Sequence, residues 1–532
     1  LVHFRLPTGP GLRIDRGVTE GDVVAPEFDP MIAKVIAHGT DRNEAVARLR
    51  RALSECAVVL DGGTTNKAFL LELLDRAEVR SSQVDTGWLE RWSAARADEA
   101  RPYADVALLA AAVEAYDDEL RVEEEQFYES AARMRPEIRR EVGRTIEFRH
   151  LGQNYKLKVF RLGRHGYRVE LDGTRAEVRI DRLSRHERWV TLRGVRHRTL
   201  CVVQGLDYLV EAEGVPHRFS RDDLGILRAP SPAVVVSLGV APGDRVEKGA
   251  RIATLEAMKM EMPIPAPFDG KVRQVFVVPN VQVGPGTPLV QIDPDAPSDG
   301  KRAARRISLP APAAAAPAGG AEGALATLDE IRRLVLGFDV DPSDARRLTR
   351  EYAEAAAALA GDAAGLEAEE RILGAFVDVS SLFRRQTGAE DPDAMGTVST
   401  GEYLLTYLRT YDTQTPDLPP RFVDRLSRAA SHYGVEGKKK SPALREALLW
   451  IWKSRQRAEH QVEPVLAILE RRLAAAEAGA GDGSPELRTV LDRLAAVAEG
   501  RWPALGDVAR ELRYRVFDQP AFEAARREVY AE

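Results

Sequence analysis

The heptapeptide EAMKMEM at residues 256–262 lies between two segments that resemble each other. The segment before it, residues 240–249, reads VAPGDRVEKG, and the segment after it, residues 279–286, reads PNVQVGPG. Three positions of these segments correspond, Pro242 with Pro279, Val246 with Val283 and Gly249 with Gly286, and just beyond them Ile252 corresponds to Leu289. Since each segment reads as a turn followed by a strand, we expect a duplicated hairpin unit whose two halves meet at Lys259.

The lysine of this heptapeptide lies between two methionines. An isolated Met-Lys-Met tripeptide would be interpreted as an exposed lysine near two core methionines, but here the repeated flanks favour a functional lysine. The whole stretch, residues 229–293, resembles the biotin carboxyl carrier domain of biotin-dependent carboxylases. That resemblance implies a flattened β-barrel with biotin attached covalently to Lys259, within a motif completed by Ala257, Met258 and Met260.

A lipoyl carrier is the main alternative within the same architecture. Lipoyl domains usually have Asp, Thr or Ser before the lysine and Ala after it, so Met258 and Met260 favour biotin. The resemblance also places Met258 and Lys259 in a two-residue hairpin loop, where Asn-Gly or Asp-Gly would be ordinary. A local departure of this kind tends to mark function. One departure from the family is Ser231-Pro232-Ala233, where Met-Pro-Gly is common.

The composition is that of a multidomain protein. With 532 residues the chain is long enough for three or four domains. Its two cysteines, Cys56 and Cys201, are far apart, which excludes a disulfide framework or a zinc site. The net charge of −6 argues against nucleic-acid binding, and no apolar run is long enough to span a bilayer. Leu1 opens directly into a strand-like pattern without a signal peptide, so we expect a cytoplasmic location and a piece of a longer protein.

The N-terminal segment, residues 1–92, has a Gly-Pro turn before Arg13, an apolar strand near residue 33, a helix from Asp41 and a Gly-Gly turn at Gly62. This order resembles the C-terminal subdomain of biotin carboxylase. The resemblance implies that Arg13 is the catalytic arginine that holds the biotin ureido group and bicarbonate. A guanidinium suits this role because it stabilises an anion without giving up a proton.

ATP-binding motifs are missing from the sequence. Residues 434–441, GVEGKKKS, lack the four-residue glycine spacing of a phosphate loop and read as a solvated loop. We therefore expect no ATP hydrolysis by this chain alone and no metal ligands within it.

Residues 101–223 contain a long helix followed by short antiparallel strands. We expect the helix over residues 105–132, capped by Asp105. The alternation that follows turns at Asp172-Gly173 and again at Glu213-Gly214, both of which are hairpin signals. The layout resembles the domain that joins the carboxylase and carboxyltransferase parts of propionyl- and methylcrotonyl-CoA carboxylases, in which a barrel wraps the helix.

The last two segments are a linker and a helical region. Residues 294–324 are rich in Pro, Ala and Gly, which predicts an extended tether, and Arg305-Arg306-Ile307-Ser308 within it has the pattern of a kinase site that also occurs by chance. Residues 325–532 have helical periodicity and form a central scaffold in our interpretation. Expected local features here are a capping box at Thr327 and Glu330, N-caps at Ser441 and Ser484, and one apolar face formed by Val462, Leu466, Leu469 and Leu473.

The predicted fold class is therefore multidomain and mixed. It comprises an α+β N-terminal subdomain, a long helix with an antiparallel β-barrel, a flattened biotinyl barrel and an all-α C-terminal region. Because more than two hundred residues follow the carrier, the order resembles single-chain multidomain acyl-CoA carboxylases, similar in plan to eukaryotic acetyl-CoA carboxylase.

That resemblance implies a function for the parent enzyme. Biotin on Lys259 carries CO2 from a biotin carboxylase site that uses ATP, Mg²⁺ and bicarbonate to a carboxyltransferase that acts on an acyl-CoA at its α-carbon. The implied partners are biotin protein ligase, the biotin carboxylase and carboxyltransferase domains of the same chain, the acyl-CoA substrate and a second copy in a homodimer. Nucleic acid and membrane are not among them. The alternatives left open are a lipoyl carrier and a structural protein whose Lys259 is unmodified.

Overall fold

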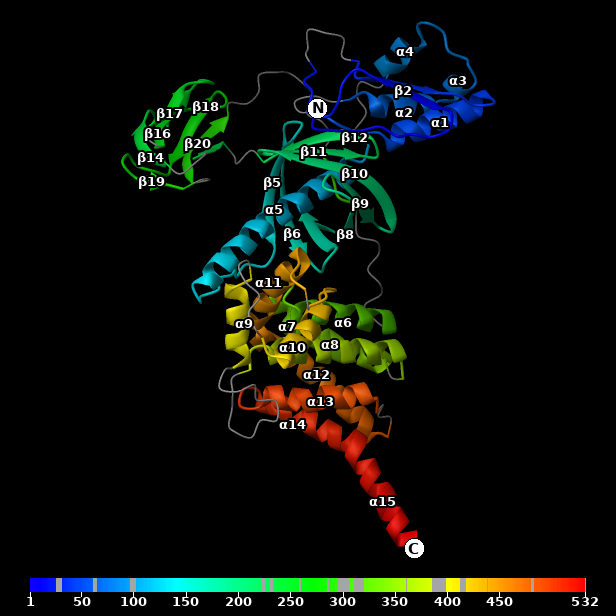
Figure 1. Ribbon diagram of the computed structural model, residues 1–532, viewed down its shortest axis with the longest axis vertical. Coiled ribbons are helices and arrows are strands. Elements are labelled where there is room, and N and C mark those ends of the chain that lie inside the picture. The colour runs from blue at the N-terminus through cyan, green and yellow to red at the C-terminus, as the bar shows by residue number, and fades with distance from the viewer. Residues whose placement is uncertain are drawn as a thin grey trace. The chain divides into compact units, whose positions relative to one another are not determined.

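The structure is a computed structural model, shown in Figure 1. The chain divides into two compact units. One comprises residues 1–112, 145–157 and 181–309, and the other comprises residues 113–144, 158–180 and 310–532. The residues that the structure describes are 1–24, 31–60, 65–95, 102–221, 225–229, 233–257, 260–284, 287–294, 306–310, 320–359, 361–384, 399–411, 418–437, 439–479 and 483–531.

The N-terminal region combines two small antiparallel sheets with helices. Strand β1 (His3–Arg5) pairs with β4 (Ala57–Val59), and β2 (Leu12–Arg16) pairs with β3 (Ala33–Ala37). Helix α1 (Arg42–Glu55) begins after Asp41, whose carboxylate accepts a hydrogen bond from the Glu44 N–H, as expected of an N-cap. The remaining helices of this region are α2 (Lys67–Asp75), α3 (Ala77–Arg80) and α4 (Trp88–Ala95).

Eight antiparallel strands close into a barrel in the order β10-β11-β12-β5-β6-β7-β8-β9. Their bounds are Arg144–His150 (β5), Gln153–Arg161 (β6), Gly166–Leu171 (β7), Thr174–Arg182 (β8), Glu187–Leu192 (β9), Val195–Gln204 (β10), Asp207–Ala212 (β11) and Val215–Ser220 (β12). Both predicted hairpins are confirmed, because Leu171 pairs with Thr174 and Ala212 pairs with Val215. The two residues of each turn have positive φ, which is the type I′ geometry that twisted hairpins favour.

Helix α5 (Ala104–Ala132) is the predicted long helix. It begins at Ala104, so Asp105 lies in the first turn and is not the N-cap that we expected. Every residue from Val106 to Tyr116 is buried, as in a helix that is covered on all sides. In the first unit the preceding Pro102 carbonyl contacts His217 of β12, at 3.2 Å from Nε2. In the second unit Asp117 accepts a hydrogen bond from Tyr167 of β7 at 3.0 Å.

The carrier region consists of two four-stranded sheets, β13-β20-β18-β15 and β17-β16-β14-β19. Their bounds are Ile226–Arg228 (β13), Ala233–Leu238 (β14), Arg245–Val246 (β15), Arg251–Ala257 (β16), Met260–Pro265 (β17), Gly270–Val275 (β18), Gln282–Val283 (β19) and Pro288–Pro294 (β20). The strands β14, β15 and β16 recur at a constant sequence offset as β18, β19 and β20, so the duplication predicted from the sequence is present in the fold. Strand β13 pairs with β20 and lies before residue 229, at which we expected the carrier to begin.

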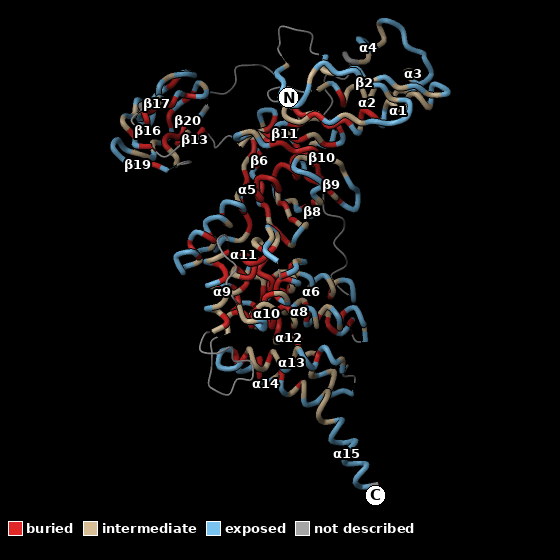
Figure 2. Tube along the Cα trace, viewed as in Figure 1, coloured by how far each residue is buried: buried red, intermediate tan, exposed pale blue. Residues whose placement is uncertain are grey.

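The C-terminal region is helical, and Figure 2 marks its buried residues. Its helices are α6 (Ala321–Val335), α7 (Ala345–Ala355), α8 (Ala363–Ser381), α9 (Thr400–Arg409), α10 (Pro420–Ser431), α11 (Pro442–Gln456), α12 (Ala458–Glu477), α13 (Pro485–Ala498), α14 (Pro503–Arg513) and α15 (Gln519–Ala531). The N-caps at Ser441 and Ser484 are confirmed, since each hydroxyl accepts a backbone N–H three residues further on. Within the described residues, no helix has both the length and the apolar character needed to cross a bilayer.

Two local expectations for this region are wrong. Thr327 lies inside α6, where its hydroxyl donates to the Gly323 carbonyl, and the helix begins at Ala321 after Gly320. The predicted apolar face of α12 is rotated, because Val465, Ile468 and Leu469 are buried while most of the predicted face is only partly covered. The physical reason is that α12 buries polar side chains as well, including Gln461 and Arg472.

Candidate biotin site

The strands that carry the predicted attachment motif form a regular hairpin. Strand β16 pairs with β17 in the register Glu256 opposite Glu261 and Ala257 opposite Met260. Met258 and Lys259 join these two ends and lie outside the described residues. The paired ends fit the expected two-residue connection, because Ala257 and Met260 are opposite each other.

The sheet beneath this hairpin is held by a closed apolar core. Ile252 and Leu255 of β16 are fully buried, together with Leu289 and Ile292 of β20. Ile252 and Leu289 occupy corresponding positions of the two halves, as the repeat predicts. A packed core on both sheets gives the strands that lead to Lys259 a rigid base.

Two carboxylates flank the motif. Glu256 and Glu261 are exposed and directly opposite each other, an arrangement in which like charges repel. The sequence supplies Lys259, whose primary amine can form an amide with the carboxylic acid of biotin, between the paired ends Ala257 and Met260. The residues present therefore fit the group.

Arg13 lies on a different folded element, strand β2. Its backbone pairs with Ile36 of β3, and its side chain is 74% exposed. The guanidinium donates through Nε to Asp15 Oδ1 at 3.0 Å, and a second contact joins Nη2 and Asp15 Oδ2 at 3.0 Å. The two side chains are on the same face of the strand because they are two residues apart.

This ion pair defines the charge state of the predicted catalytic arginine. The hydrogen bond with Asp15, and then its negative charge, raise the pKa of Arg13. The same hydrogen bond lowers the pKa of Asp15. Arg13 is therefore a permanent, solvent-accessible cation that a bound anion would have to share with Asp15. Asp15 was not predicted as the partner of Arg13, although the period of two of a strand places both side chains on one face.

Arg13 lies in the β2-β3 sheet, and the carrier hairpin lies in the separate sheet β17-β16-β14-β19. Among the described residues there is also no group of three or more His, Cys, Asp or Glu side chains that could hold a metal ion.

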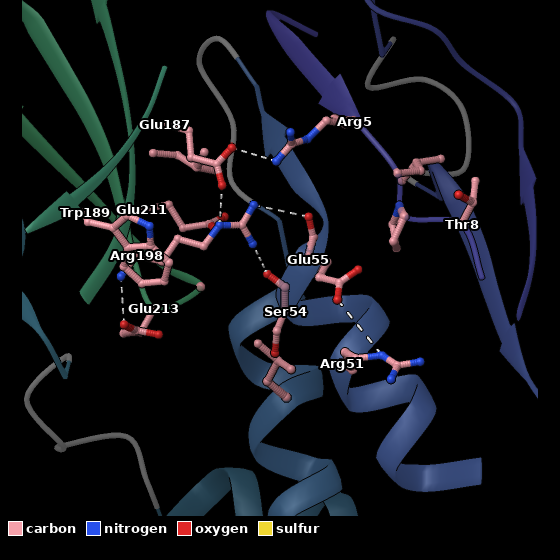
Figure 3. Close-up of a pocket in the computed structure, with 15 residues that line it drawn as sticks. Arg5, Thr8, Arg51, Ser54, Glu55, Glu187, Trp189, Arg198, Glu211 and Glu213 are labelled. Carbon is pink, nitrogen blue, oxygen red and sulfur yellow. Dashed lines mark hydrogen bonds and ion pairs between the residues drawn. The ribbon is translucent and has the colours of Figure 1, made fainter. Parts of the chain in front are cut away.

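A cavity of about 770 Å³, lined by charged and apolar side chains, lies between the N-terminal region and the barrel, within the first unit (Figure 3). Arg198 of β10 crosses it: Nε donates to Glu187 at 2.7 Å, and Nη2 donates to the Glu55 carbonyl at 3.3 Å. A third bond joins Arg198 to the Ser54 carbonyl, so one arginine caps the C-terminal end of α1. Arg5 reaches Glu187 from the other side at 2.6 Å.

A buried ion pair lies close to this cavity. The ammonium of Lys67, at the start of α2, donates to Glu211 of β11 at 2.5 Å and to the Cys56 carbonyl at 2.6 Å. Burial raises the pKa of Glu211, and the charge of Lys67 offsets only part of that rise. Sequence reasoning missed this pair and Arg198, because contacts between residues so far apart leave no local pattern.

Comparison with known families identifies two parts of the chain. Residues 1–91 match the family described as biotin carboxylase C-terminal domain, and residues 226–292 match the family described as biotin-requiring enzyme. The chain is homologous to the alpha subunits of biotin-dependent acyl-CoA carboxylases. The second match implies covalent biotin, and its first residue coincides with the start of β13.

Individual proteins are similar to about half of this chain. The methylcrotonoyl-CoA carboxylase alpha subunit of Arabidopsis thaliana is 29% identical over 352 residues, which cover 55% of this chain and 46% of that protein. The propionyl-CoA carboxylase alpha chain of Rattus norvegicus is 26% identical over 53% of this chain and 41% of its own length. The acyl-coenzyme A carboxylase alpha3 subunit of Mycobacterium leprae is 29% identical over 54% of this chain and 39% of its own length. The chain thus spans less than half the length of these relatives.

A solved structure of a single-chain, multi-domain long-chain acyl-CoA carboxylase is 22% identical, over 57% of this chain and 19% of that one. Its TM-score of 0.17 is too low to support a structural argument.

Proposed function

We propose that this chain is the biotin carrier and scaffold core of a biotin-dependent acyl-CoA carboxylase. The main support is the register of the β16–β17 hairpin, which pairs Ala257 with Met260 and leaves Met258 and Lys259 between them in the sequence. This hairpin lies within residues 226–292, which match the biotin-requiring enzyme family. The division that we propose is a biotin carboxylase C-terminal subdomain (1–92), an interaction domain (101–223), a carrier (229–293, extended by β13), a linker (predicted as 294–324, but ended by α6 at Ala321) and a helical scaffold (predicted as 325–532, which α6 extends to begin at Ala321).

Lys259 is the proposed attachment residue, with Ala257, Met258 and Met260 forming the motif that biotin protein ligase reads. When bound, biotin supplies a ureido nitrogen that accepts a carboxyl group derived from bicarbonate and releases it to the α-carbon of an acyl-CoA. The chain's own contribution is to hold that group on a rigid, two-sheet base. The carboxyl donor site requires ATP and Mg²⁺, and its nucleotide-binding residues are not found in this sequence.

Arg13 is the proposed catalytic arginine. Its guanidinium is exposed and permanently charged, so it can face the negative charge that develops on the ureido oxygen. Asp15 keeps the guanidinium oriented along one face of β2. An arginine suits this position better than a lysine because its planar fork can bind Asp15 and a second anion at the same time.

The partners in this proposal are biotin protein ligase, biotin carboxylase and carboxyltransferase domains of the same chain, and an acyl-CoA. A homodimer and a cytoplasmic location remain part of the proposal, although several relatives are named as mitochondrial. By itself the chain should be inactive.

The full-length parent protein provides the test. It is incubated with ATP, Mg²⁺ and labelled bicarbonate, and with acetyl-, propionyl- or long-chain acyl-CoA in separate reactions. Label that becomes acid-stable in one acyl-CoA, and only with ATP, supports the proposal and identifies the substrate. Biotinylated protein that transfers label to none of these acyl-CoAs would refute the assignment as an acyl-CoA carboxylase.

A further inference from the structure

A short segment of the predicted linker, Arg306–Pro310, is described by the structure, whereas residues 295–305 and 311–319 on either side are not. The segment belongs to the first unit up to Leu309. Exposed and buried side chains alternate along it, because Ile307 and Leu309 are buried while Arg306 and Ser308 are exposed. That period of two is the pattern of an extended chain with one face against a protein surface.

The contacts of this segment are made with strand β6. The Ile307 N–H donates to the Tyr155 hydroxyl at 3.0 Å, and this bond is buried. Arg306 Nη1 donates to the Asn154 carbonyl at 2.8 Å, and its guanidinium lies 4.9 Å from the centre of the Tyr155 ring. Tyr155 thus provides a hydrogen-bond acceptor, an aromatic face and a buried side chain at one place.

A tether predicted from its composition would not make such contacts. Proline, alanine and glycine favour a solvated, extended chain, and a solvated chain leaves its aliphatic side chains in water. Ile307 and Leu309 are instead 8% and 6% exposed. Burial of two aliphatic side chains and of one backbone hydrogen bond gives the segment a defined docked position.

We propose that Arg306–Leu309 is a latch that docks on Asn154 and Tyr155 of the barrel and ends the carrier's tether at residue 305. The purpose of the latch rests on the proposed carrier function, but its docking does not. In the sequence only residues 221–225 separate β12 from β13, so the carrier is already joined to the barrel on the side that precedes it. The docked latch shortens the connection that follows the carrier from residues 295–320 to residues 295–305, so the carrier is joined to the barrel on both sides, which limits how far it can travel.

Hydrogen exchange of the full chain tests the docking. The Ile307 amide should exchange slowly in the native protein, and Ile307→Ala combined with Leu309→Ala should accelerate its exchange at least about tenfold. Tyr155→Phe removes only the acceptor hydroxyl and should accelerate exchange at the same amide. Ser308→Ala changes an exposed side chain of the same segment and should leave the exchange rate unchanged, which makes it the matched control.

Trypsin gives a second readout that is independent of biotin. Cleavage after Arg306 should be slow in the native chain and at least about tenfold faster in the Ile307→Ala, Leu309→Ala variant, with unchanged cleavage after Arg513. Native-like protection of the Ile307 amide and of the Arg306 bond in that variant and in Tyr155→Phe would overturn the latch. A chain whose Lys259 takes no biotin would instead overturn the proposed function, while both latch readouts would still decide the docking.

Discussion

The pair Lys67–Glu211 is the most informative place to perturb the joint between the N-terminal region and the barrel. Both side chains are nearly inaccessible, with 6% and 10% of their surfaces exposed, and the Lys67 ammonium also satisfies the Cys56 carbonyl. Lys67→Met keeps the length of the side chain and removes its charge and its donors. The change leaves a carboxylate and a carbonyl buried without the donor that each now has.

Breaking a buried ion pair from one side costs about 3–5 kcal/mol, because the remaining charge is desolvated and uncompensated. Here the cost depends on pH. Burial already raises the pKa of Glu211, and the loss of Lys67 removes the attraction that opposes this rise, so the pKa of Glu211 increases further in the variant. A folded-state pKa above the unfolded value means that the folded variant binds the extra proton. The stability that Lys67→Met loses relative to the native chain is therefore smallest below the unfolded pKa of Glu, about 4.3. This loss grows as the pH rises toward the folded pKa of Glu211, by up to ~1.4 kcal/mol per pH unit.

Hydrogen exchange of peptides from α2 and β11 in the full chain gives the local free energy of opening at pH 5 and pH 8. We expect a larger deficit for Lys67→Met at pH 8 than at pH 5. The matched control is Lys67→Met combined with Glu211→Leu, which removes both charges and should recover most of the lost stability. An equal loss of stability at both pH values, or a double variant as unstable as the single one, would show that the unpaired charge of Glu211 is not the cause of the loss.

Two further predictions concern Arg13 and the helical region. In the full-length parent, Arg13→Ala should reduce the rate of carboxyl transfer about 10²–10³-fold without affecting biotin attachment. The control Arg16→Ala, on the opposite face of β2, should leave the rate unchanged. Equal rates for both variants would contradict the role of Arg13. Burial would raise the pKa of Asp378, but its hydrogen bond with His432 and the charge of Arg493 hold this pKa below the ordinary value. The ionised Asp378 carboxylate therefore stabilises the fold above its unfolded pKa of about 3.9, and this contribution is lost as the pH falls. Asp378→Asn should lower the free energy of unfolding by about 2–4 kcal/mol at pH 7 and weaken its dependence on pH in acid, measured by circular dichroism. An unchanged dependence on acid pH would contradict this prediction.

The features that could be predicted from the sequence are those with local causes. The Asp172-Gly173 and Glu213-Gly214 turns were predictable because positive φ at two successive residues requires particular residue types. The Ser441 and Ser484 caps follow from the same kind of short-range rule. The repeat of the carrier could be predicted because its two halves have matching residues at a constant spacing. In the structure the two halves form the same strands, β14, β15 and β16 in the first and β18, β19 and β20 in the second.

The remaining features depend on contacts between distant residues. Glu369 is fully buried because Arg471 and Arg472 reach it from α12, and this polar burial rotates the covered face of α12 away from the predicted apolar one. Arg198 and the Lys67–Glu211 pair act through partners that no periodicity reveals, whereas the period of two of a strand already places Asp15 on the same face as Arg13. For the candidate site, the sequence predicted the strands around Lys259 but not the ion pair that orients Arg13.

Biotin attachment at Lys259 can be measured as the intact mass of the chain after co-expression with biotin protein ligase. We expect a mass increase of one biotinyl group in a chain that binds streptavidin; the increase should disappear in Lys259→Arg and persist in the control Lys271→Arg of the same domain. An unshifted mass in the native chain, or a shift that persists in Lys259→Arg, would show that Lys259 does not carry biotin.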